Sequence, residues 1–200
     1  MTTIYLIRHG QTVNNERSLW GGDSLLTADG IDDAIGIKNK NLQIDALFVS
    51  NKESTKQTAD YAFPEMNYIS SGDFDEIYFG VFEDTRYELK DNIDKDEVRK
   101  TFYKDLYNFH KISRGESATS KAIRFILALD EIAKKYDGKK VAVISSETII
   151  LASLAYLYRG NVNYKSDLEL DTGEILELEC EDDAIVLKGP LLDTFKNMVI

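Results

Sequence analysis

The chain has 200 residues, 43% of them hydrophobic, and carries a formal net charge of -11 with a pI near 4.7. The length favours one domain, and the apolar content allows a sizeable core. So acidic a surface repels nucleic acid and anionic membranes, and no run of Lys and Arg reverses the charge locally. We therefore expect neither nucleic acid nor membrane as a partner.

Strands and helices alternate along most of the sequence. Apolar runs predict strands over residues 3–7, 43–49, 66–70 and 140–145. Composition and helical spacing predict helices over residues 27–41, 52–62, 117–136 and 147–158. Thr27 is the expected N-cap of the first helix, and Asp29 in its first turn suits the helix dipole. The tail alternates apolar and polar residues, which predicts a hairpin over 174–180 and 184–188.

This order of elements predicts an α/β fold, a three-layer sandwich with a mostly parallel central sheet and helices on both faces. We expect one domain over residues 1–200. Residues 73–115 are highly charged and aromatic, and we interpret them as an inserted, largely helical cover with a helix near 94–108. In such sheets ligands bind beyond the carboxyl ends of the strands.

The cysteine content and the N-terminus favour a cytoplasmic protein. Cys180 is the single cysteine, so no internal disulfide can form, and no Cys and His cluster indicates a metal site. The first ten residues are too poor in apolar residues for a signal peptide, and no stretch approaches the length of a transmembrane helix.

A candidate site follows the first predicted strand, in the sequence LeuIleArgHisGlyGlnThr over residues 6–12. A neutral imidazole such as His9 can attack phosphorus, and a guanidinium such as Arg8 can hold two phosphate oxygens. Thr12 and nearby backbone amides would complete a phosphate cradle. Taken alone, the short motif also fits a surface arginine beside a hydrogen-bonded histidine that arose by chance.

The run from Leu6 to Ala34 resembles the histidine phosphatase superfamily, which includes the cofactor-dependent phosphoglycerate mutases. The residues that can be laid on the family's pattern are Arg8, His9, Gly10, Gln11, Thr12, Asn15, Asp23, Leu26, Thr27 and Gly30. The resemblance implies a phosphoglycerate-mutase-like fold, with His9 as phosphate acceptor and Arg8 as phosphate ligand. It also implies substrate contacts from the motif and the glycine turn after it, at Gln11, Thr12, Asn15 and Gly22.

Later segments match the same family. Gln57, Thr58 and Ala59 fit its Gln-Thr-Ala segment, and residues 115–117 fit its Gly-Glu-Ser signature before a helix. Asp75 to Gly80 resembles the segment that carries the family's catalytic acid, which implies this role for Glu76. A solvated carboxylate in an acidic stretch is the alternative interpretation of Glu76.

Three positions depart from the family's pattern. Ser54 stands where the second pocket arginine is expected, Ser146 where the second histidine is expected, and Glu147 where a glycine follows that histidine. Losing one preorganised donor to the phosphoryl oxygens typically costs about 3–4 kcal/mol in the transition state. An ionised Glu147 would also repel a phosphate dianion. Lys52 and His110 are candidate substitutes, although a solvated lysine and a surface histidine are the simpler interpretations.

Two functions compete. The first is phosphomonoester hydrolysis or transfer through a phosphohistidine at His9, weakened by the lost arginine and histidine. The second is a catalytically inactive pseudophosphatase that binds a ligand or a protein partner, and a third, weaker idea is a pocket altered for a less anionic substrate. The family's chemistry uses histidine, arginine and a carboxylic acid, so the resemblance implies no metal and no cofactor. The expected partner is a small phosphorylated metabolite or phosphate ion, and a homodimer stays an open alternative.

Overall fold

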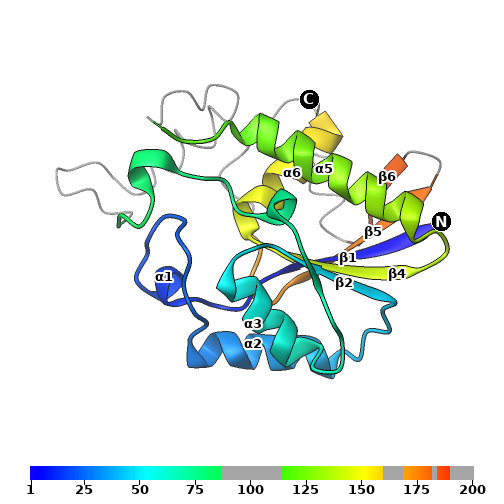
Figure 1. Ribbon diagram of the computed structural model, residues 1–200, viewed down its shortest axis with the longest axis horizontal. Helices are drawn as coiled ribbons and strands as arrows, with labels where there is room; N and C mark the ends of the chain where they lie inside the picture. The colour runs from blue at the N-terminus through cyan, green and yellow to red at the C-terminus, as the bar shows by residue number, and fades with distance from the viewer. Residues whose placement is uncertain (87–113, 160–168, 182–183, 190–200) are drawn as a thin grey trace.

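A mixed sheet forms the centre of the protein (Figure 1). The computed structural model describes residues 1–86, 114–159, 169–181 and 184–189. Six strands of the described residues lie in the order β3-β2-β4-β1-β5-β6. Their bounds are Thr2–Arg8 for β1, Ala46–Val49 for β2, Ile69–Ser70 for β3, Lys140–Ser145 for β4, Ile175–Glu181 for β5 and Ala184–Leu187 for β6. The pairs among β1 to β4 are parallel, whereas β5 pairs antiparallel with both β1 and β6.

Helices cover both faces of this sheet (Figure 1). The α-helices of the described part are α1 (Val13–Glu16), α2 (Ala28–Asn39), α3 (Glu53–Ala62), α5 (Ala118–Lys135) and α6 (Glu147–Arg159). In Figure 1, α2 and α3 lie on one side of the sheet and α5 and α6 on the other. The predicted α/β sandwich is therefore confirmed. Within the described residues, no helix is long and apolar enough to cross a membrane.

Strand β1 is buried on both faces, which explains why its sequence is a continuous apolar run. Ile4 and Leu6 pack into the core beneath α5 and α6. Tyr5 and Ile7 alternate with them and join the smaller core on the side of α2 and α3. Packing on both faces consequently fixes the carboxyl end of β1, and this rigid strand positions the residues that follow it.

Local sequence signals explain where the helices begin. Thr27 is the N-cap of α2 as predicted, and its hydroxyl oxygen accepts a hydrogen bond from Gly30 N at 3.1 Å. Ser117 caps α5 in the same way by accepting from Ser120 N. Lys52 precedes α3 without a side-chain cap, so the N-terminal turn of α3 depends on neighbouring loops.

Most differences from the sequence prediction concern short elements. Strand β2 begins at Ala46 rather than residue 43, and β3 has two residues instead of the five predicted over 66–70. The one-turn helix α1 was not predicted. Residues 72–74 and 80–82 form the 3-10 turns η1 and η2. The helix predicted near 94–108 and His110 lie outside the described residues, so the inserted cover over 73–115 stays a prediction for the most part.

Candidate active site

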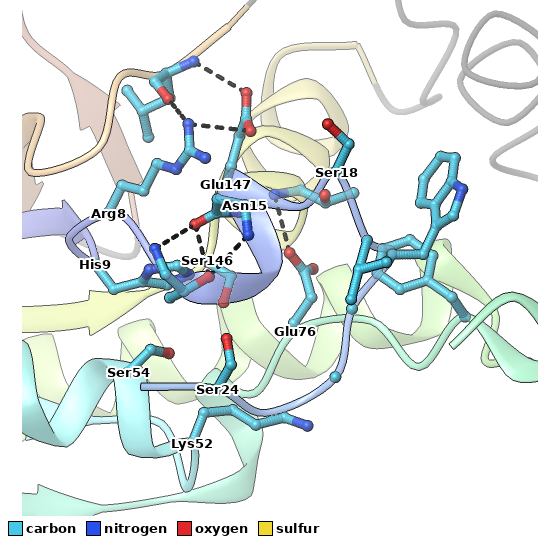
Figure 2. Close-up of a pocket in the computed structure, with 18 of the residues that line it drawn as sticks. Arg8, His9, Asn15, Ser18, Ser24, Lys52, Ser54, Glu76, Ser146 and Glu147 are labelled. Atoms are coloured by element: carbon cyan, nitrogen blue, oxygen red, sulfur yellow. Dashed lines mark hydrogen bonds and ion pairs between the residues drawn. The ribbon is translucent and has the colours of Figure 1, made fainter. Parts of the chain in front are cut away.

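The carboxyl ends of three parallel strands meet at one edge of the sheet. Arg8 at the end of β1 lies opposite Ser145 of β4, and Val49 of β2 lies opposite Ile144. The residues that follow these strands line a cavity of about 260 Å³. It contains Arg8, His9, Lys52, Ser54, Glu76, Ser146 and Glu147, which Figure 2 labels. The position agrees with the expectation for ligand sites in parallel sheets.

His9 is held as a neutral imidazole in the wall of this cavity. Its side chain is buried, and Nδ1 lies 2.8 Å from the carbonyl oxygen of Gly10. A carbonyl can only accept, so Nδ1 carries the proton and Nε2 keeps its lone pair. Burial, with the neighbouring Arg8 charge as a second cause, lowers the pKa of His9 to about 4. At neutral pH the ring is therefore uncharged and has a nitrogen available for nucleophilic attack.

Two close glycine contacts fix the exit of the chain from β1. A Cβ on Gly10 would lie 2.2 Å from the carbonyl oxygen of Gly30, and a Cβ on Gly30 would lie 1.9 Å from that of Gln11. Gly10 N also donates to Thr58 Oγ1 at 3.1 Å, which ties the turn to α3. The motif glycines are thus required by backbone packing between β1 and α2.

Arg8 does not face open solvent but an internal carboxylate. Its Nη1 lies 3.1 Å from Glu147 Oε2 and also donates to the carbonyl oxygen of Leu170. Glu147 Oε1 accepts a hydrogen bond from Leu170 N at 3.2 Å. Arg8 Nε is buried and has no hydrogen-bond partner among the described residues. In Figure 2 the guanidinium points toward Glu147, away from Ser54 and Lys52 on the opposite side of the cavity.

Glu76 has the properties of a proton donor. Its carboxylate accepts from Ile77 N at 2.8 Å and from Thr148 N, at the start of α6, at 3.3 Å. Burial raises the pKa of Glu76 to about 7, and the charge of Glu147 acts in the same direction. A carboxylic acid that stays protonated close to neutral pH can donate a proton to a leaving group.

The positions that depart from the family's pattern all lie in the cavity. Ser54 and Ser146 are both buried and line it. The cavity wall therefore has a serine at the two positions where the family resemblance leads us to expect an arginine and a histidine. Lys52 also lines the cavity, and its ammonium group has no ion pair within the described part of the chain. Figure 2 places Lys52 beside Ser24, below Ser54. Lys52 therefore lies on the same side of the cavity as Ser54, whereas Arg8 lies on the opposite side.

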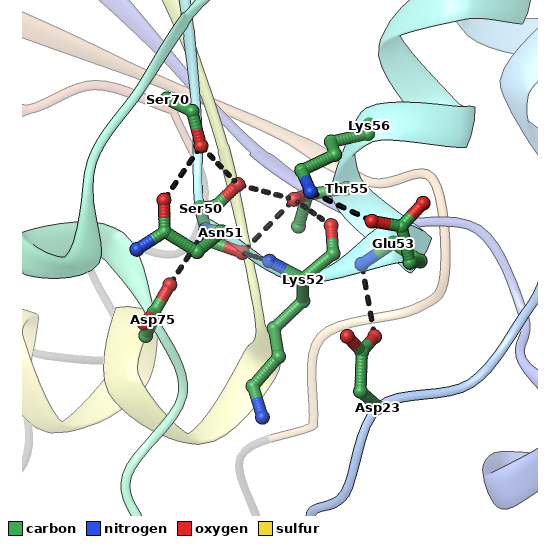
Figure 3. Close-up of polar contacts among 9 residues, drawn as sticks. All are labelled: Asp23, Ser50, Asn51, Lys52, Glu53, Thr55, Lys56, Ser70 and Asp75. Carbon is green, nitrogen blue, oxygen red and sulfur yellow. Dashed lines mark hydrogen bonds and ion pairs between the residues drawn. The ribbon is translucent and has the colours of Figure 1, made fainter.

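The turn that carries Lys52 and Ser54 is held by polar contacts (Figure 3). Ser50 Oγ lies 2.9 Å from Thr55 Oγ1 and accepts from Lys52 N at 3.1 Å. Glu53 N donates to Asp23 Oδ1 at 2.9 Å, which connects this turn to the loop after α1. The backbone before α3 is therefore well positioned, while Figure 3 shows the Lys52 side chain extending away from these contacts.

The other predicted substrate contacts divide into two groups. Thr12, Asn15 and Gly22 line the cavity. Thr12 and Asn15 also form a capping box at α1, with Asn15 N donating to Thr12 Oγ1 at 3.1 Å. Gln11 is not among the lining residues, and its side-chain oxygen accepts from Thr27 Oγ1 at 2.7 Å. Gln11 thus contacts the N-cap of α2, and its role in substrate binding stays a prediction without geometric support.

Sequence reasoning missed several contributors to the cavity. Ser18, Trp20, Ser24, Phe79, Thr148, Leu170 and Asp171 line it as well. Leu170 and Thr148 act through backbone groups, which leave no signature in a sequence. The remaining side chains lie on loops whose course depends on tertiary contacts, so their spacing gives no signal. No group of three or more His, Cys, Asp and Glu side chains in the described ranges is arranged to hold a metal ion.

This architecture recurs in solved enzymes of phosphate metabolism. A phosphoserine phosphatase from Entamoeba histolytica, solved with phosphoserine, superposes with a TM-score of 0.81 at 22% identity, over 94% of this chain and 96% of that one. A phosphoglycerate mutase from Bacillus anthracis gives a TM-score of 0.78 at 18% identity, over 97% and 94% of the two chains. The fold is therefore that of the phosphoglycerate-mutase-like proteins.

Sequence comparison identifies the family. The profile of the histidine phosphatase superfamily (branch 1) matches residues 4–190, and the chain belongs to this superfamily. It is 30% identical over 162 residues to a 6-phosphofructo-2-kinase/fructose-2,6-bisphosphatase from Caenorhabditis elegans, and 27% identical over 194 residues to isoform 3 from Bos taurus. These alignments cover 78% and 94% of this chain but 34% and 38% of the relatives. The chain therefore spans little more than a third of the curated relatives it matches.

Proposed function

We propose that the protein acts on phosphomonoesters through a phosphohistidine at His9. The observation that carries this proposal is a buried, neutral imidazole with its Nδ1 proton fixed on the Gly10 carbonyl oxygen, in a cavity that also contains an acid with a pKa of about 7. The names of the relatives combine a 6-phosphofructo-2-kinase with a fructose-2,6-bisphosphatase, and two solved neighbours hold phosphoserine and 3-phosphoglyceric acid. A small phosphorylated metabolite is accordingly the expected substrate.

The reaction has two steps. In the first, the Nε2 lone pair of His9 forms a bond to phosphorus while the bond between phosphorus and the ester oxygen breaks. Glu76 gives its proton to the departing alkoxide, which leaves as the alcohol. In the second step, water attacks phosphorus and ionised Glu76 takes a proton from that water. The bond between phosphorus and Nε2 breaks, its electron pair returns to His9, and inorganic phosphate leaves. An alcohol in place of water would give phosphoryl transfer instead.

Turnover is expected to be weak. Ser54 and Ser146 supply hydroxyl groups but no charge where the family has an arginine and a histidine. Arg8 is already paired with Glu147. Lys52 is the described cation best placed to reach a phosphoryl group from the far side of the cavity.

Hydrolysis of an aryl phosphate by the wild type, His9→Ala and Glu76→Gln proteins tests the proposal. We expect hydrolysis to disappear in His9→Ala. Intact-protein mass spectrometry after rapid quenching should show one added phosphoryl group in the wild type and in Glu76→Gln, which keeps the nucleophile, but none in His9→Ala. Equal background rates in the wild type and His9→Ala, with no adduct, would refute it. Thermal melting of both variants controls for folding.

A second candidate function is a catalytically inactive pseudophosphatase that binds a ligand or a protein partner. The ion pair between Arg8 and Glu147, together with the two serines, favours this alternative. It predicts that phosphate or a phosphorylated ligand raises the melting temperature without any release of inorganic phosphate. Turnover that depends on His9 would count decisively against it.

A further inference from the structure

The contacts of Arg8 form a closed network inside the cavity wall. Glu147 bridges the guanidinium and the Leu170 N–H, while Arg8 donates to the carbonyl oxygen of the same Leu170. Side-chain exposures of 13% for Arg8 and 19% for Glu147 show that solvent screens this pair only in part. A carboxylate and a phosphoryl group offer a guanidinium the same kind of paired oxygen acceptors. Glu147 therefore occupies a place on Arg8 that a phosphoryl group would need.

The other charges of the cavity also disfavour the binding of a phosphoryl dianion. The cavity lining contains the cations Arg8 and Lys52, against the carboxylates of Glu147, Glu169 and Asp171 and the carboxyl group of Glu76. A phosphoryl dianion entering this cavity meets a repulsive carboxylate at the guanidinium that should hold it. Like charges in a partly desolvated site weaken binding strongly, because the effective dielectric constant is far below that of water.

We propose that Glu147 determines which charges a ligand of this site must carry. Because Glu147 is paired with Arg8, it weakens the binding of phosphate esters that have no positive charge, and it favours esters that carry an ammonium group close to the phosphoryl group. An ammonium group can pair with Glu147 while the phosphoryl oxygens take its place on Arg8. Binding then exchanges one internal ion pair for two pairs with the ligand. An ester without a cation must instead separate Arg8 from Glu147 and leave a carboxylate beside its own negative charge.

This proposal rests on the site being a phosphate-ester site, but it concerns binding and not turnover. The test therefore compares two ligands that differ in the ammonium group, phosphoethanolamine and ethyl phosphate. Their dissociation constants are measured by calorimetry in the wild type and in a His9→Ala background, where the proposed transfer cannot occur. The same measurements are repeated in both backgrounds with Glu147→Ala, which removes the carboxylate. They are also repeated with Glu147→Gln, which keeps the size of the side chain and an acceptor for Leu170 N.

With Glu147 present, we expect phosphoethanolamine to bind about 10-fold or more tighter than ethyl phosphate. In Glu147→Ala the ratio should fall close to one, because ethyl phosphate binds about 10- to 100-fold tighter once Arg8 is free. Glu147→Gln should change the ratio in the same direction. Asp171→Asn is the matched control, since it removes another carboxylate of the cavity wall without touching the Arg8 pair.

An equal ratio with and without Glu147 would overturn the proposal, as would an equal change in Asp171→Asn, which would indicate a general field effect. Failure of both ligands to bind any variant would also overturn it. A changed ratio without any His9-dependent hydrolysis would leave this inference standing and reject the proposed phosphatase activity. Thermal melts of each variant exclude misfolding as the cause.

Discussion

Replacing Glu76 with glutamine should change how stability depends on pH. Burial raises the pKa of Glu76 from 4.5 to about 7 in the folded protein. Between these values the unfolded chain has lost this proton while the folded protein still binds it. The free energy of unfolding therefore falls as pH rises through this window, by about 1.4 kcal/mol per pH unit. Glu76→Gln removes this loss, which amounts to about 3 kcal/mol across the whole window.

His9 opposes Glu76 in the wild type. Its pKa falls from 6.5 to about 4 on folding, so between these values the unfolded chain binds a proton that the folded protein does not. The free energy of unfolding thus rises with pH in this range, again by about 1.4 kcal/mol per pH unit. The two contributions nearly cancel between pH 4.5 and 6.5 in the wild type. Glu76→Gln should therefore unmask the upward slope that His9 supplies.

Urea unfolding measured at several values from about pH 5 to about pH 7.5 tests this reasoning, with the single Trp20 as fluorescent reporter. The stability of Glu76→Gln minus that of the wild type should increase by about 2.5 kcal/mol over this range, with most of the increase below pH 7. Glu53→Gln is the matched control for the change from carboxyl to amide, because its side chain is 52% exposed rather than buried. Parallel profiles for Glu76→Gln and the wild type would refute the argument.

Three further substitutions probe the cavity and its support. Ser54→Arg should tighten inorganic phosphate binding about 10-fold, measured by calorimetry, whereas the uncharged Ser54→Gln should not. Gly30→Ala should cost more than about 2 kcal/mol in urea unfolding, since its Cβ would lie 1.9 Å from the Gln11 carbonyl oxygen; a neutral effect would contradict the packing argument. Thr58→Val should cost about 2 kcal/mol, because Gly10 N loses its acceptor and the Ser54 carbonyl oxygen loses its hydroxyl donor, and an unchanged urea midpoint would show that neither bond contributes.

The strands that position the site could be predicted from the sequence because they depend on local apolar patterns. Continuous apolar runs identified β1 and β4, and the parallel sheet then brought His9 and Ser146 to the same edge. The prediction that Ser54 and Glu147 lie with them rested on the family resemblance, and the cavity contains both. Their functional roles stay predictions until the variants are measured.

The rest depended on contacts between distant parts of the chain. The partner of Arg8 and Glu147 is the backbone of Leu170, which lies 162 residues beyond Arg8, and its N–H and carbonyl groups are common to nearly every residue type. Gln11 matched the motif but contacts Thr27, because the direction of a side chain after a tight turn depends on what packs against it. The short α1 turn is likewise fixed by its capping contacts rather than by an apolar pattern.

The close approach of Gly10 and Gly30 limits how such a signature can be used to identify enzymes. Both glycines are demanded by backbone contacts, so a descendant that had lost all catalysis would still have to keep them in order to fold. The presence of these glycines therefore indicates common ancestry, but it does not indicate that a protein is catalytically active. In surveys of genomes, the discriminating positions are those whose side chains are expected to meet the phosphoryl group, here Ser54, Ser146 and Glu147.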